Sequence, residues 1–160
     1  MTLDVSFILT VVAVAADGML AGASLDQSLK QLPARHRIGA VAYAAYTQAA
    51  DLGPGVLWYG ILGVGAAVLT IAAGVTAVVR HVGAPVIVPL VIAGALSIFH
   101  SLATTQAAPA MFSQRHVPQT DAALGAVFAR FARWQTIRVT LQVLTLAAVV
   151  WALVAWFALA

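Results

Sequence analysis

The chain has 160 residues, of which 62% are hydrophobic and only 8% are charged, with eight Lys and Arg against five acidic residues. Since a soluble domain carries about a quarter charged residues, this composition excludes a soluble protein and predicts an integral membrane protein with one domain over residues 1–160. The absence of cysteine excludes disulfides and thiol nucleophiles. Cations confined to short connecting segments argue against a nucleic-acid-binding protein.

Four stretches are apolar enough and long enough to cross a bilayer, which takes about 20 residues. They cover residues 5–25, 54–79, 84–108 and 135–159. Two connecting segments also have helical character: residues 36–52 are rich in Ala, and Thr120 with Asp121 is suited to cap a helix that has arginines on its wetter side. We therefore expect an all-α, four-helix membrane bundle with two amphipathic segments on one face.

The cations alternate between the connecting segments, which indicates how the chain is oriented. Only Arg80 separates the second and third apolar stretches. The segments after the first stretch and before the fourth contain six: Lys30, Arg35, Arg37, Arg115, Arg130 and Arg133. By the positive-inside rule, the first and third connections are expected in the cytoplasm and both termini outside, in a bacterial plasma membrane.

Asp17 lies inside the first apolar stretch, where a carboxylate costs about 2.5–3.5 kcal/mol at a helix centre. Counted from the cytoplasmic helix ends at about 1.5 Å per residue, Asp17 and His100 lie roughly 12 Å deep and Gln142 roughly 10 Å deep. Arg138 lies one turn nearer the surface. These residues belong to polar stripes at helical spacing, and such stripes face the bundle interior in lipid. We therefore predict a polar pocket that is closed on the outer side and open toward the cytoplasm.

The residues of this pocket suggest acid–base chemistry on a lipophilic molecule. Asp17 and His100 are the candidate catalytic residues, since an imidazole oriented by a carboxylate can abstract an acidic C–H or phenolic proton. Arg138 and Gln142 are candidates for holding an enolate or carbonyl oxygen. The other candidate substrate-binding residues are aromatic or hydroxylic: Trp58, Tyr59, Thr104 and Trp134.

Two other functions fit the same pattern. A small proton-coupled transporter, or a subunit of one, would use Asp17 and His100 as a proton relay and needs a second polar stretch leading outward. A non-catalytic membrane partner or assembly protein would use the polar stripes only to lock helices together. In that case Asp17 pairs directly with Arg138 or with another helix, helped by the close-packing motif Gly18-x-x-x-Gly22.

The sequence predicts no metal site and no haem, because paired ligand motifs such as His-x-x-x-His are absent and only His100 lies deep in a span. The expected partners are a lipophilic small molecule and membrane lipid, with no nucleic acid. A homo-oligomer is also compatible with the sequence.

Three short segments resemble the anthrone oxygenase-like family of small four-helix membrane proteins. They are Phe128-Ala-Arg-Phe-Ala-Arg-Trp-Gln-Thr-Ile-Arg138, Thr104-Thr-Gln-Ala-Ala-Pro109 and Ala21-Gly-Ala-Ser24. The resemblance implies a four-helix fold and oxidation of an anthrone-like polyphenol to a quinone by O₂ without a bound cofactor. It also implies that Trp134 and Arg138 belong to the site.

Overall fold

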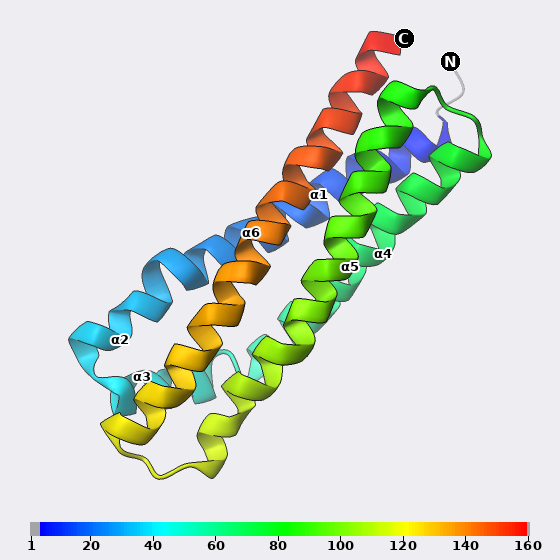
Figure 1. Cartoon of the computed structure of the whole chain (residues 1–160). Coiled ribbons are helices and arrows are strands. Elements are labelled where there is room, and N and C mark those ends of the chain that lie inside the picture. Colours follow the sequence, from blue (N-terminus) through cyan, green and yellow to red (C-terminus); the bar gives the residue numbers. More distant parts are fainter. Residues whose placement is uncertain (1–3, 160) are drawn as a thin grey trace.

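The computed structural model describes residues 4–159, and they form an all-α bundle with no strand in this part of the chain (Figure 1). This confirms the predicted fold class. The α-helices are α1 (Val5–Asp26), α2 (Leu32–Ile38), α3 (Ala40–Ala49), α4 (Pro54–Val79), α5 (Ala84–Phe112) and α6 (Asp121–Leu159). A π-helical turn, η1 (Gln27–Gln31), joins α1 to α2, and a 3₁₀ turn, η2 (Ser113–His116), follows α5.

Four helical segments are long and apolar enough to cross a membrane: Val5–Ile38, Pro54–Val79, Ala84–His116 and Asp121–Ala158. The chain is therefore an integral membrane protein. The amphipathic helix predicted from Asp121 and the span predicted from residue 135 are one continuous helix. At about 1.5 Å per residue, the 39 residues of α6 extend well beyond a hydrocarbon core of about 30 Å, so one end of α6 lies outside the bilayer.

The first span also continues as helix beyond its predicted end at residue 25. The continuation passes through the π turn η1, in which the N–H of Leu32 donates to the carbonyl of Gln27. Pro33 follows directly, and a proline ring inside a regular α-helix clashes with the carbonyl four residues earlier. The wider π turn accommodates this proline without ending the helix. Gly39, with φ of 86°, then reverses the chain between α2 and α3.

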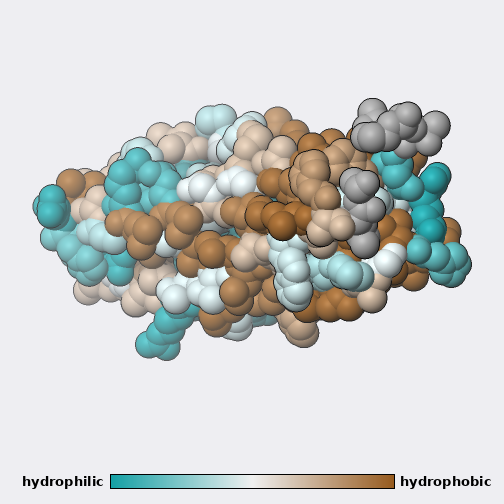
Figure 2. All heavy atoms as spheres, turned by 90° about the horizontal axis from the view of Figure 1, so that it is seen from above, coloured by the Kyte–Doolittle hydropathy of each residue, from teal (hydrophilic) through white to brown (hydrophobic). Residues whose placement is uncertain are grey.

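Two apolar clusters lie at opposite ends of the bundle. The cap cluster joins α2, α3 and the adjoining ends of α5 and α6: Leu32, Tyr43, Ala44, Leu52, Ala107, Ala110, Met111, Leu124, Val127, Phe128 and Phe131. The terminal cluster lies on the side of both chain termini: Ala73, Ala77, Val86, Leu90, Ala93, Ala148, Val149, Ala152 and Ala155. Figure 2 shows hydrophilic residues gathered at both ends of the visible face and hydrophobic residues between them.

The aromatic residues of the cap cluster hold α3 against α6. The ring of Tyr43 meets that of Phe128 edge to face, with centroids 4.9 Å apart, and burial raises the pKa of the Tyr43 phenol. The carboxylate of Asp121 accepts hydrogen bonds from the backbone N–H of Ala40, at 2.9 Å, and of Val41. These contacts fix the short helices across the cytoplasm-predicted end of the bundle.

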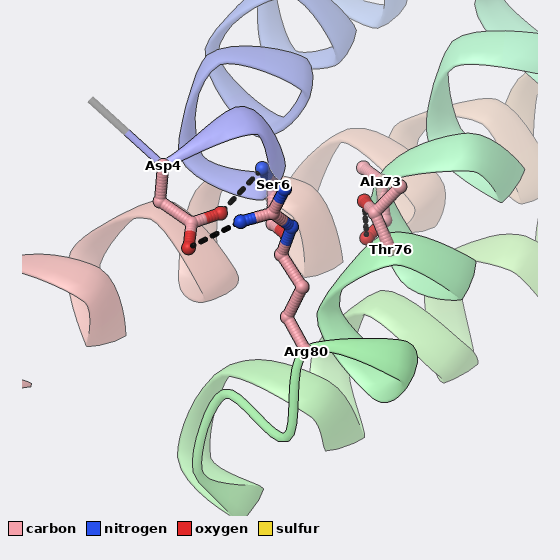
Figure 3. A network of polar contacts seen from close by, with 5 residues as sticks. All are labelled: Asp4, Ser6, Ala73, Thr76 and Arg80. Carbon is pink, nitrogen blue, oxygen red and sulfur yellow. Dashed lines mark hydrogen bonds and ion pairs between the residues drawn. The ribbon is translucent and has the colours of Figure 1, made fainter. Parts of the chain in front are cut away.

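At the opposite end, Asp4 caps α1 and ties it to α4 (Figure 3). Its carboxylate accepts a 2.7 Å hydrogen bond from the backbone N–H of Ser6 and lies 3.7 Å from the guanidinium of Arg80. The backbone hydrogen bond from Ser6 is the main cause that lowers the pKa of Asp4. In the same view, the hydroxyl of Thr76 donates to the carbonyl of Ala73. It also donates to the carbonyl of Ala72, so both of its partners belong to its own helix.

Candidate functional site

Polar side chains fill the layer between the two apolar clusters. On α5, Ser97 and His100 lie between Ala93 of the terminal cluster and Ala107 of the cap cluster. On α6 the same layer contains three buried polar residues, namely Gln135, Gln142 and Thr145. The layer has two parts. One is a hydrogen-bonded group formed by Asp17, Thr70 and Gln142, and the other is a cavity beside Arg138.

Asp17 is 1% exposed, and both of its carboxylate oxygens are occupied by neighbouring helices. Thr70 of α4 donates its hydroxyl to Oδ2 at 2.6 Å, and Gln142 of α6 donates its amide to Oδ1 at 2.9 Å. In residues 4–159 Asp17 forms no ion pair with Arg138 or any other cation. The carboxylate therefore joins three helices through hydrogen bonds.

His100 and Arg138 line a cavity of about 210 Å³ that does not include Asp17. His100 is 4% exposed, and its Nε2 has no hydrogen-bond partner among the described residues. We call this space the inner cavity; its remaining walls are Leu20, Tyr59, Gly60, Gly63, Val64, Ser101 and Thr104. A buried polar atom normally has a partner, so the unpaired imidazole nitrogen of a residue that lines a cavity marks His100 as a candidate for ligand binding.

A second cavity of about 210 Å³ adjoins the inner one on the side of the cap cluster. We call it the outer cavity. It shares Tyr59, Gly60, Thr104 and Arg138 with the inner cavity, so these four residues form the boundary between the two spaces. An apolar cavity of about 150 Å³ is large enough for benzene. The two spaces together therefore have room for a molecule with fused rings.

Arg138 is held at this boundary by a neighbour on its own helix. Its Nη1 donates to Oε1 of Gln135 at 2.9 Å, three residues earlier on α6. The amide of Gln135 in turn donates to the carbonyl of Ser24 at 3.3 Å and to the hydroxyl of Ser28 at 3.2 Å. Gln135 thus connects α6 to α1 and η1 and fixes Nη1 of the guanidinium.

Arg138 has no carboxylate partner within residues 4–159, where the ion pairs involve other residues. Its Nε is buried and makes no hydrogen bond to the described residues. A cation inside a span is costly unless an anion or polar atoms surround it. The boundary between the cavities is therefore suited to an anionic or strongly polar oxygen.

The outer cavity ends at polar residues near the membrane surface. Gln27 and Asp51 line it, and the amide of Gln27 lies 3.4 Å from Oδ2 of Asp51. Burial raises the pKa of Asp51, although the hydrogen bond from Gln27 acts in the opposite direction. Arg115 donates to the carbonyl of Leu52 at 2.8 Å and holds this end of the cavity together.

The structure brings only part of the predicted site together. Tyr59, Thr104, Arg138 and His100 share the inner cavity. In contrast to the predicted Asp17–His100 pair, no hydrogen bond joins these two side chains in the described part of the chain, and Asp17 lies outside the cavity walls. Asp17 and His100 do lie at the same depth in the bundle. The side chain of Asp17, however, points toward Thr70 and Gln142.

Gln142 and both predicted tryptophans also lie outside the two cavities. Gln142 is 1% exposed, and its side-chain amide donates a hydrogen bond to the carboxylate of Asp17. Trp58 is 52% exposed, because neighbouring residues on a helix point about 100° apart and Tyr59 takes the inward direction. Trp134 is half-buried and lines a separate groove between α5 and α6, beside Phe99. None of these three residues therefore lines either of the two cavities.

Several residues of the site were not among the predicted ones. Gln135, Ser24 and Gln27 were visible as members of polar stripes, but spacing alone does not indicate that Gln135 holds Arg138. Gly60 and Gly63 follow Tyr59 on the cavity side of α4. Small residues on the inward face of a span, next to an aromatic residue that faces the same way, are the signal that would have found them.

No group of three or more His, Cys, Asp or Glu side chains in residues 4–159 is arranged to hold a metal ion. In comparisons with known proteins, no protein-family description, no curated protein and no solved structure matches this chain.

Proposed function

We propose that this protein is a membrane-embedded oxygenase that binds a lipophilic aromatic molecule of the anthrone or quinol type in the two adjoining cavities. The observation that carries this proposal is that His100, whose Nε2 has no partner among the described residues, lines the same cavity as Arg138, which has no carboxylate partner in residues 4–159. A proton acceptor and a fixed cation beside an apolar space are the groups needed to form and hold an enolate.

In the proposed reaction His100 takes a proton from the acidic CH₂ of an anthrone, and Arg138 holds the oxygen on which the negative charge develops. The electron-rich enolate then reacts with O₂, which is the oxidant. Overall one CH₂ and one O₂ give one ring carbonyl and one water, so that one oxygen atom of O₂ stays in the product. Gln135 positions Arg138, and Tyr59 and Thr104 contribute walls and hydroxyl groups.

The environment of Asp17 supports its assignment as a connector of helices and not as the proton acceptor. A carboxylate whose two oxygens already accept hydrogen bonds from Thr70 and Gln142 has less capacity to accept a substrate proton. The terminal cluster argues against the transporter alternative. This cluster consists of Ala, Val and Leu, and the buried polar residues of α1 on that side, Ser6 and Thr10, carry no ionisable group.

The proposed orientation follows the charge distribution. The helices α2 and α3 lie at the cation-rich end and are proposed to face the cytoplasm of a bacterial plasma membrane, with both termini outside. The outer cavity then opens near the cytoplasmic surface.

The test uses the purified protein in lipid nanodiscs, with a hydroxylated anthrone under ¹⁸O₂ and subtraction of spontaneous oxidation. We expect a quinone that contains one ¹⁸O atom. His100→Ala is expected to lower the rate by about 10²-fold or more, and Arg138→Gln is expected to lower it strongly as well. The matched controls, His116→Ala and Arg130→Gln, change exposed residues and are expected to retain the rate.

Two results would overturn the proposal. One is the absence of any protein-dependent quinone formation across a panel of anthrones and quinols. The other is a His100→Ala variant that is as active as the His116→Ala control.

A further inference from the structure

The two cavities reach the lipid-facing surface of the bundle between α4 and α5. On α4 the wall is formed by Val56, Gly60 and Val64, which lie one helical turn apart and are all exposed, Val64 at 67%. On α5 it is formed by Ser101 and Phe112, which are also exposed. Since both helices are membrane spans, side chains exposed here face hydrocarbon.

Gly60 lies at the centre of this opening, because it belongs to the walls of both cavities. A Cβ atom built at Gly60 meets nothing within 4 Å, and the same is true at Gly63, one turn further along α4. Glycine inside a helix is less favourable than alanine, so its presence needs a reason. Here the missing side chains leave the space between α4 and α5 open.

The other approach to the cavities is polar. At the membrane surface the outer cavity is bounded by Gln27 and Asp51, which are joined by a hydrogen bond, and by Leu52, whose carbonyl is bound by Arg115. A lipophilic molecule concentrates in the bilayer, and passage along this end would require it to cross polar groups. The opening beside Gly60 presents apolar walls instead.

We infer that the ligand reaches the site sideways from the bilayer, through the opening between α4 and α5, and that Gly60 sets the width of this opening. The ligand class is a flat, membrane-dissolved molecule with an acidic oxygen, which Arg138 receives at the boundary between the cavities. Gly60 is thus a specificity-determining residue: it admits fused rings whose entry a bulky side chain would hinder. This inference rests on the proposed use of the cavities as a ligand site, but not on the proposed oxidation.

The experiment measures how fast 9-anthracenecarboxylic acid, a rigid three-ring acid, associates with the protein in nanodiscs. Energy transfer from tryptophan to the bound anthracene reports binding, and empty nanodiscs provide the background. Gly60→Phe is expected to slow association by roughly tenfold or more, and Gly60→Val to slow it less. The matched control is Gly22→Phe, because Gly22 is exposed on α1 and a Cβ there also meets nothing within 4 Å.

The outcomes separate this inference from the proposed reaction. Saturable, Gly60-dependent binding by a protein that oxidises no anthrone would support the inference and contradict the oxygenase proposal. Association of Gly60→Phe and Gly60→Val at the rate of Gly22→Phe would overturn the inference, even if oxidation is observed. A wild-type protein without saturable binding of the probe would overturn it as well.

Discussion

The environments of Asp17 and His100 show how two ionisable residues at one depth differ in their availability to a ligand. Asp17 accepts hydrogen bonds from two other helices, whereas Nε2 of His100 has no partner among the described residues. A polar residue in a span therefore suggests function most strongly when its hydrogen-bonding capacity is left unused beside a cavity.

Removing one hydrogen-bond donor of Asp17 should destabilise the bundle. Thr70→Val leaves one buried carboxylate oxygen without its donor, which costs about 1–3 kcal/mol. Thr76→Val is the matched control on the same helix, because Thr76 bonds only carbonyls of α4. Thermal unfolding in detergent should show a clearly lower midpoint for Thr70→Val than for Thr76→Val. Equal midpoints would contradict the structural role given to Asp17.

Asp51 should make stability depend on pH. Burial raises its pKa in the folded state, so the folded state binds more protons than the unfolded state between the ordinary and the raised pKa. Stability is therefore lost as pH rises through this window, and Asp51→Asn avoids that loss. Thermal unfolding should show the variant to be more stable than the wild type at neutral pH, with the difference vanishing toward about pH 4. A difference that does not change with pH would contradict this environment.

At the scale of helices, the sequence predicted helix boundaries best where they depend on hydropathy alone. The second span was predicted as residues 54–79 and is observed as α4, Pro54–Val79. Hydropathy does not determine where a helix ends outside the membrane. For this reason α6 begins 14 residues before the predicted fourth span, and α1 continues through η1 into α2.

Helical spacing predicted the site only partly. It selected His100, Thr104 and Arg138, which do share a cavity. Spacing does not indicate which inward-facing residues form hydrogen bonds with each other, because that depends on the rotation of each helix against its neighbours. Asp17 and Gln142 were assigned to the pocket for this reason, but they bind each other.

The N-terminal cap of α1 offers a test at the scale of one element. Asp4→Ala removes the hydrogen bond to the backbone N–H of Ser6 and the ion pair with Arg80. Loss of an N-cap costs about 1 kcal/mol. We expect a lower unfolding midpoint for Asp4→Ala and a smaller effect for Asp4→Asn, since asparagine also caps helices. If alanine and asparagine were equivalent here, the cap would not be the source of the stability.

At the scale of the whole molecule, the arrangement is an apolar cap and an apolar terminal layer with a polar layer between them. Cations gather at the cap, which we propose to be cytoplasmic. The chain has no cysteine, so single cysteines report topology directly. In spheroplasts, a membrane-impermeant maleimide should label Ala84→Cys, at the first residue of α5, and should label Gln119→Cys only after lysis. The reverse pattern would invert the proposed orientation.

The residues proposed to act on the ligand line the cavities beside Arg138, and Asp17 is not one of them. The most direct measurement compares two conservative variants, Asp17→Asn and His100→Gln, for protein-dependent oxidation of a hydroxylated anthrone in nanodiscs. The asparagine side chain of Asp17→Asn can still accept from Thr70, and the amide of Gln142 can turn to accept from it. This variant should therefore remain folded and within a few-fold of the wild-type rate. The oxidation rate of His100→Gln should be lower than that of the wild type by about 10²-fold or more. An inactive, folded Asp17→Asn beside an active His100→Gln would contradict the account.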